Sequence, residues 1–236
     1  MTEERDTEHS LLDVDWGEPP SDAELAAART DTSLAVPDQT EVVPDAAREL
    51  ETIMSDVHVN GGAHLGVVRV PPNDALDYYL SRSGANEWFR RDVLASDALA
   101  EALPALDLPA DRHPQDYTDL DWTRYPSYTL DGHLAARLVD GGAYYGFLEP
   151  PFHDVDAEID GYEHVPDSYG DRSDAKRLGE RFVDAVFDER YDEFSAYVTF
   201  DQWCDWFVSV PAWDATYVCF DQRTRLAWVL VVTGAD

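Results

Sequence analysis

The stretch "LAWVLVV", residues 226–232, is apolar at every position. Successive side chains of a strand point to opposite faces of its sheet, so this segment would present apolar side chains on both. Strands of that kind occur where both faces of the sheet are covered. The stretch "ATYVCF" precedes it, and the linker "DQRTR" between them predicts a terminal β-hairpin. We therefore expect the second strand of this hairpin to lie centrally in a sheet.

The remainder of the chain combines strand and helix patterns. β-Branched and aromatic residues predict strands at residues 63–70 and 193–200. Helical spacing and capping residues predict helices over residues 73–84, 86–103 and 173–190. Residues 131–140 fit either a short helix or a strand. The sequence thus predicts an α+β fold, with a small and mostly antiparallel sheet packed by several short helices.

The first 47 residues are expected to form a loosely ordered acidic arm. They contain short apolar islands between many acids, prolines and glycines. Ser21 with Glu24 predicts a capping box for two helical turns, which are too short to be stable alone. Residues 48–236 are expected to form a single globular α+β domain.

The chain carries 17 basic residues against 49 acidic ones, a formal net charge of −32. Such a charge destabilises a compact state unless it is screened, and molar salt shortens the Debye length to about 3 Å. The acids are spread over the whole length, and Lys176 is the single lysine. This pattern indicates a halophilic, salt-accumulating organism. Acidic residues concentrated in one segment would instead favour a nucleic-acid mimic or a partner of basic proteins. Nucleic acid is not expected as a ligand, because its phosphates would be repelled.

Neither a membrane segment nor a secretory signal is expected. No apolar run approaches the roughly 18 residues of a membrane span, and the first ten residues are acidic and polar. We therefore expect a soluble, cytoplasmic protein. Cys204 and Cys219 form no C-x-x-C pair, which favours two small buried hydrophobic side chains.

Histidines are the first candidates for catalysis, but none has the H-E-x-x-H spacing of a metal site. Those with neighbouring carboxylates could serve a hydrolase or a metal-dependent enzyme. These candidates are His58, His64, His133, His153 and His164. A histidine beside acids is expected by chance in so acidic a chain, so we expect no bound metal and no cofactor.

The segment "DQWCDWFVSVPAWD", residues 201–214, has the highest aromatic density. Thr199 with Gln202 predicts a capping box for a helix that would place Trp203, Trp206 and Phe207 on one face. That face could be core, or it could be a protein-binding surface, because Trp and Tyr are frequent in both. The candidate partner-binding residues are Tyr144, Tyr145, Trp203, Trp206, Phe207, Trp213 and Asp214.

Residues 134–236 also carry a series of short motifs. These are G-G-A-Y at 141–144, W-x-x-W-F at 203–207, W-D-x-T at 213–216 and a terminal T-G-A-D. Together they resemble a family of small uncharacterised bacterial proteins that end in T-D-x-D; here Gly234 stands in place of the first acid. The family looks like those encoded beside toxin systems, where immunity proteins are common. The resemblance implies a binding role without a known activity.

From these observations we expect a non-enzymatic, protein-binding protein of a halophile, and the resemblance implies an immunity-like role. The alternative is the hydrolase or metal-dependent enzyme that would use the histidines and their neighbouring acids.

The charge generates the first testable prediction. Salt screens repulsion between carboxylates, and excluded salts also strengthen apolar burial, so stability should climb with salt concentration. The midpoint of thermal unfolding should rise by at least about 10 °C between about 0.1 M and 2 M KCl. A midpoint that stays flat over this range would contradict the halophile interpretation.

Overall fold

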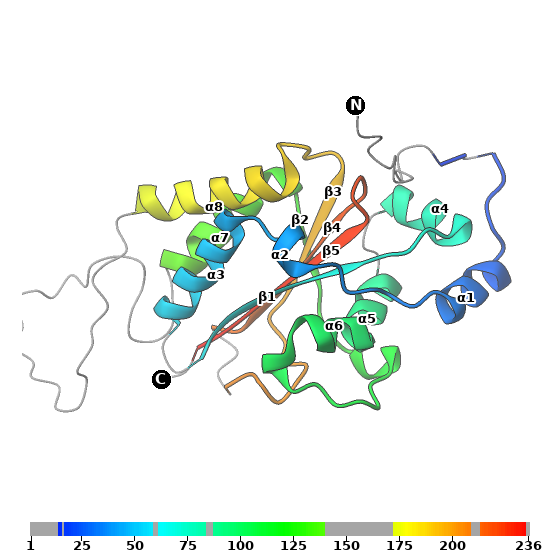
Figure 1. The fold of residues 1–236 in the computed structure, drawn as a ribbon, viewed down its shortest axis with the longest axis horizontal. Helices are drawn as coiled ribbons and strands as arrows, with labels where there is room; N and C mark the ends of the chain where they lie inside the picture. The colour runs from blue at the N-terminus through cyan, green and yellow to red at the C-terminus, as the bar shows by residue number, and fades with distance from the viewer. Residues whose placement is uncertain are drawn as a thin grey trace, which may run out of the picture.

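Five strands form one antiparallel sheet in the computed structural model, which describes residues 14–15, 17–58, 61–83, 87–139, 172–208 and 213–234. The strands are β1 (Gly62–Arg69), β2 (Thr123–Tyr125), β3 (Phe194–Thr199), β4 (Ala215–Asp221) and β5 (Leu226–Thr233). Their order across the sheet is β1-β5-β4-β3-β2. The terminal hairpin is therefore confirmed, and both of its strands lie inside the sheet (Figure 1).

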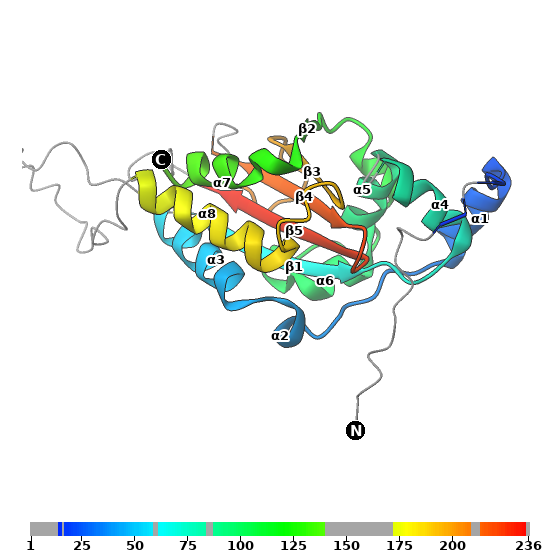
Figure 2. The same ribbon diagram turned by 90° about the horizontal axis from the view of Figure 1, so that it is seen from above.

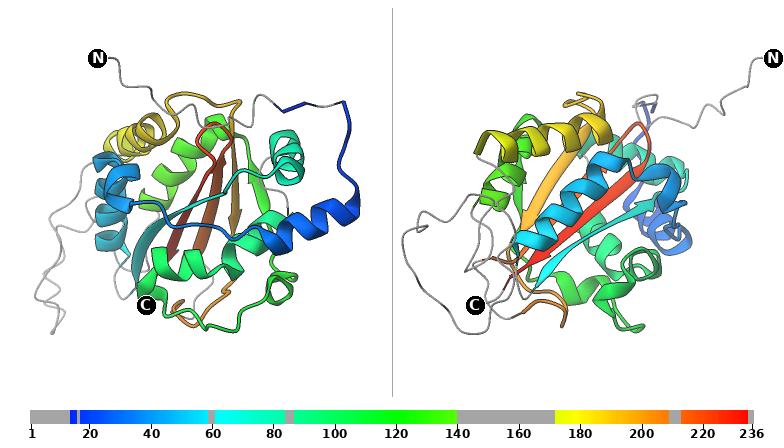
Figure 3. Two further views of the ribbon diagram at one scale, coloured as in Figure 1. Left: turned by 45° about the vertical axis from the view of Figure 1, so that its right-hand side comes forward. Right: turned by 60° about the vertical axis from the view of Figure 1, so that its left-hand side comes forward.

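Helices cover both faces of this sheet. They are α1 (Asp22–Asp31), α2 (Gln39–Val42), α3 (Asp45–Val57), α4 (Asp74–Ser83), α5 (Glu87–Ala95), α6 (Asp97–Ala102), α7 (Leu130–Val139) and α8 (Arg172–Phe187). Helices α3, α7 and α8 lie on one side, and α5 and α6 lie on the other (Figure 3). The predicted α+β class is confirmed. In the described part of the chain no helix is long and apolar enough to cross a membrane.

Strand β5 shows why two helical layers are needed. Leu226, Trp228, Leu230 and Val232 belong to the core that α3, α7 and α8 cover. The alternate residues belong to the second core, under α4, α5 and α6; they are Ala227, Val229 and Val231. Every residue of β4 and β5 is buried. At about 25 cal/mol per Å² of apolar surface, this burial is a main favourable contribution to folding.

Strand β1 lies at the edge of the sheet as far as the chain is described. Side chains form hydrogen bonds with the backbone groups along its outer edge. The Ser55 hydroxyl donates to the Ala63 carbonyl oxygen (2.9 Å) and accepts from the Ala63 backbone N–H (3.0 Å). The Gln39 amide makes the same pair of bonds with Val67, at 2.8 and 3.1 Å. Helices α2 and α3 run beside this edge (Figure 2). An edge whose backbone groups are already satisfied offers little to an added strand.

The segment predicted to be an arm contacts the domain where it is described. The Ser21–Glu24 capping box at the start of α1 is confirmed. Ala35 forms two backbone hydrogen bonds with Arg69, and α1 packs against α4. The predicted boundary after residue 47 falls inside α3, which spans Asp45–Val57.

The predicted helix over residues 86–103 is wrong in one respect, because two helices replace it. Ser96 lies between α5 and α6 with an extended backbone. Its hydroxyl accepts from the Leu99 N–H (3.1 Å) and donates to the Val93 carbonyl oxygen (2.8 Å). A serine side chain can form hydrogen bonds with nearby backbone groups in this way. Ser96 therefore ends α5 and caps the N-terminus of α6. The ambiguous segment 131–140 forms helix α7.

The contact between α7 and α8 provides a second prediction. A methyl group on Gly179 of α8 would collide with the backbone carbonyl oxygen of Asp131, so Gly179→Ala should lower the free energy of unfolding by about 1–3 kcal/mol. Gly132→Ala in α7 is the matched control, because a Cβ there meets nothing within 4 Å. It should raise stability by up to about 1 kcal/mol. Urea unfolding measures both, and equal effects would refute this packing.

Candidate functional site

The aromatic segment that follows β3 is a loop, so the helix predicted through Trp203, Trp206 and Phe207 is wrong. The Thr199 hydroxyl accepts from the Asp201 N–H (3.2 Å) and thus closes a turn at the end of β3. The Gln202 side chain, expected to complete a capping box, instead reaches another part of the chain. Tertiary hydrogen bonds have replaced the local ones that a helix needs.

Those tertiary bonds form a polar network that is buried except at Gln202, which lies at the surface. The Asp214 carboxylate is fully buried and accepts from the Gln202 amide (2.6 Å) and the Thr233 hydroxyl (2.5 Å). The Trp203 indole N–H donates to the Thr216 hydroxyl (2.7 Å). We call these five residues the anchor network. Buried polar groups that are fully hydrogen-bonded specify one arrangement, because any other would leave them unsatisfied.

The anchor network holds the loop over residues 201–208 against the start of β4 and the end of β5. Thr233 is the last residue of β5, and its hydroxyl also accepts from the backbone N–H of Val208 (3.0 Å). Thr216 lies near the start of β4, opposite Thr199 of β3. The loop is thus tied to two neighbouring strands at the same end of the sheet.

Burial divides the candidate partner-binding residues. Trp203 and Phe207 are 9% and 7% exposed and belong to the core under α4–α6, and Asp214 is fully buried. These three residues therefore offer little surface to a partner in this structure. Trp206 and Trp213 are only partly buried and stay candidates. Tyr144 and Tyr145 lie outside the described residues.

Three partly exposed aromatic side chains lie at one end of the sheet, where β1 and β4 begin and β3 and β5 end. Phe200 lies beside α7, whereas Trp206 packs against the core on the opposite face. Trp206 contacts the ring of His64 in β1, with 5.1 Å between centroids. Trp213 lies two residues before β4, separated from it by one residue. Phe200 directly follows β3, is 39% exposed, and lies 5.3 Å beneath the Arg137 guanidinium. We define Phe200, Trp206 and Trp213 as the aromatic rim.

Sequence reasoning missed Phe200. It was included in the predicted strand 193–200, where an aromatic side chain is ordinary. The signal that could have found it is its position directly before "DQWCDWF", outside the last strand pair between Thr199 and Thr216. That register depends on the paired strand and is not visible in the local sequence.

The histidines of the enzymatic alternative lie apart where they are described. His58 is buried at the end of α3, and His64 in β1 lies 3.9 Å from a Glu51 oxygen. His133 of α7 stacks on Tyr125, with 3.5 Å between ring centroids. His153 and His164 lie outside the described ranges. Within those ranges no group of three His, Cys, Asp or Glu residues could hold a metal ion.

The two cysteines have the environment of core residues. Burial raises the pKa of the Cys219 thiol to about 12 and that of Cys204 to about 11. The thiolate, which is the nucleophilic form, is therefore scarce at neutral pH. Neither thiol is activated for nucleophilic chemistry.

No protein-family model, curated protein or solved structure matches this chain. The role of the aromatic rim therefore has to follow from its own geometry and chemistry.

His58 generates the third prediction. Burial, with a contribution from the Arg137 charge, lowers the pKa of His58 from 6.5 to about 4, and neither ring nitrogen has a hydrogen-bond partner among the described residues. Between these values the unfolded chain binds the proton and the folded protein does not. Stability should therefore fall as the pH drops from about 6.5 towards 4, by roughly 2 kcal/mol at pH 5 from this residue.

His58→Phe removes that proton-binding group and keeps a ring in the buried site. Urea unfolding at pH 7.5 and pH 5, in about 2 M KCl to screen the carboxylates, compares the variant with the wild type. The loss of stability between the two pH values should be smaller in the variant. An identical loss in both proteins would contradict this environment for His58.

Proposed function

We propose that the protein acts by binding another protein through the aromatic rim, and not by catalysis. The observation that supports this is that Phe200, Trp206 and Trp213, all partly exposed, lie at the same end of the sheet. Protein interfaces concentrate binding energy in a few aromatic and arginine side chains near their centre. Arg137, over the Phe200 ring, adds a side chain of that second kind.

The rim is also held in place before any partner binds. Asp214, adjacent to Trp213, is hydrogen-bonded to Gln202 and Thr233, and the indole of Trp203 fixes the loop that carries Trp206. Binding surfaces that are ordered in advance lose less conformational entropy on association. The anchor network therefore supports a binding role for the exposed aromatic side chains beside it.

A salt-rich environment, which the charge of the chain suggests, would favour binding through apolar side chains. In molar salt, charges more than about 3 Å apart are largely screened, whereas excluded salts strengthen the burial of apolar surface. An acidic protein with a net charge of −32 would then associate mainly through apolar contacts such as the rim. The same charge disfavours a nucleic acid as the partner.

The motif resemblance suggests the class of partner. The motif residues Trp203, Asp214 and Thr216 belong to the anchor network, and the motif residues Trp206 and Trp213 belong to the rim. On the proposed immunity-like role, the partner is a protein toxin that the rim contacts and blocks.

Affinity capture in about 2 M KCl, followed by titration of the purified partner, tests the proposal. Trp206→Ser and Phe200→Ser should each weaken binding at least about tenfold, which is the effect of losing a hot-spot aromatic residue. Tyr128→Ser is the matched control, because Tyr128 is 69% exposed and lies before α7, outside the rim. A partner that binds all three variants as it binds the wild type would refute the rim as its site.

A further inference from the structure

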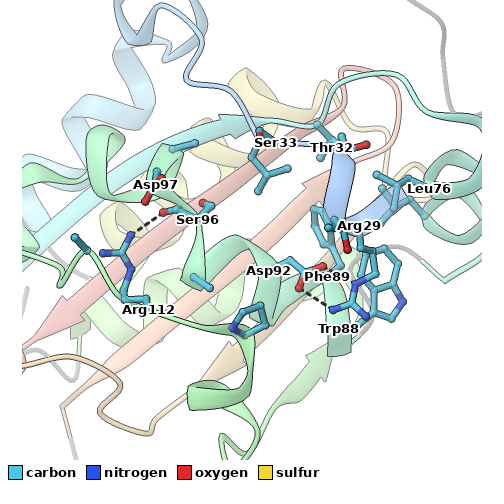
Figure 4. A pocket seen from close by; sticks show the side chains of 18 residues that line it. Arg29, Thr32, Ser33, Leu76, Trp88, Phe89, Asp92, Ser96, Asp97 and Arg112 are labelled. Atoms are coloured by element: carbon cyan, nitrogen blue, oxygen red, sulfur yellow. Dashed lines mark hydrogen bonds and ion pairs between the residues drawn. The ribbon is translucent and has the colours of Figure 1, made fainter. Parts of the chain in front are cut away.

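A cavity of about 370 Å³ lies apart from the aromatic rim, on the face of the sheet that α4, α5 and α6 cover. One wall is the chain that leaves α1, and the other is formed by α5 and α6 (Figure 4). The lining is mixed: Leu34, Leu76 and Phe89 supply an apolar part, and arginine, aspartate, serine and threonine side chains supply a polar part. The volume of the cavity lies within the range of small-molecule sites.

At one end of the cavity, the positive charge of an arginine is neutralised by an aspartate. The Arg29 guanidinium forms a bidentate ion pair with Asp92, with both N–O distances at 2.8 Å. The same guanidinium lies 4.9 Å from the centre of the Trp88 ring. Because its charge and its planar edge are already engaged, this end closes the cavity and does not attract a charged ligand.

Arg112 lines the other end together with Asp97, and no ion pair joins these two side chains. Figure 4 shows the Arg112 guanidinium across the cavity from the Arg29–Asp92 pair. It donates only to backbone carbonyl oxygens, of Ser96 (2.9 Å) and of Pro109. Its Nε is buried with no acceptor in the described part of the chain, and no described carboxylate forms an ion pair with it.

We propose that this cavity binds a small monocarboxylic acid with an apolar body. The carboxylate would pair with Arg112, and the body would lie on Leu34, Leu76 and Phe89. At roughly 20–30 Å³ for each non-hydrogen atom, the volume holds a ligand of about 12 to 18 such atoms. Among the described lining residues Arg112 is the arginine without an ion pair, so it could take one carboxylate. Asp97 at the same end and the net charge of −32 would repel a multiply charged anion.

An aliphatic and an aromatic acid share this chemistry, so the test uses one of each. Calorimetric titration of the full chain in about 2 M KCl would compare octanoate with 1-octanol, and 4-phenylbutyrate with 4-phenylbutan-1-ol. At least one acid should bind at least about tenfold more tightly than its alcohol, because only the acid can form a charge-assisted pair. The acid that binds better identifies the source as aliphatic or aromatic.

Variants separate the two parts of the site. Arg112→Gln should reduce the preference for acid over alcohol to below about threefold, and Ala95→Leu, which fills the cavity, should weaken acid and alcohol alike. Arg124→Gln is the matched control, because it removes the same charge from an exposed position in β2. It should bind as the wild type does.

Three results would overturn the proposal: no binding of either acid, equal binding of acid and alcohol, or an unchanged acid preference in Arg112→Gln. If Arg112→Gln does not fold, unchanged acid affinity in Ala95→Leu overturns it instead. Because the cavity and the aromatic rim share no residue, failure here leaves the proposed protein-binding function to its own test.

Discussion

The burial of β4 and β5 on both faces is the constraint on which the other elements depend. Every residue of these two strands is buried, so the sheet requires one helical layer on each side. Helices α3, α7 and α8 supply one layer, and α4, α5 and α6 supply the other. The close contact between Gly179 and Asp131 lets α7 and α8 pack together within the first layer. The acidic surface is the outside of this three-layer arrangement, and salt acts on it from solution.

The ends of the strands then set where aromatic side chains can be exposed. The loop from Asp201 to Val208 has to pass over the end of β5, and the buried carboxylate of Asp214 holds it there. One part of the loop therefore fills the core, as Trp203 does, while Trp206 stays at the surface. The same aromatic segment is both core and rim, which is why its composition alone could not distinguish the two.

Features with a local physical cause could be predicted from the sequence. The hairpin followed from two apolar segments around a polar linker, and the start of α1 followed from the Ser21–Glu24 capping box. The loop at Trp203 could not be predicted, because the partner of its indole is Thr216 on another strand. The cavity was equally invisible, since residues as distant in sequence as Arg29 and Arg112 line it.

Hydrogen exchange of backbone amides, followed by NMR in about 2 M KCl, tests the central constraint most directly. Amides of β4 and β5, such as those of Val218 and Val229, should exchange last and only through global unfolding, because both faces of these strands are buried. Amides of α1, which has one buried residue, should exchange much earlier. If the amides of β4 and β5 exchanged as fast as those of α1, the doubly covered sheet would not be the stable centre of this protein.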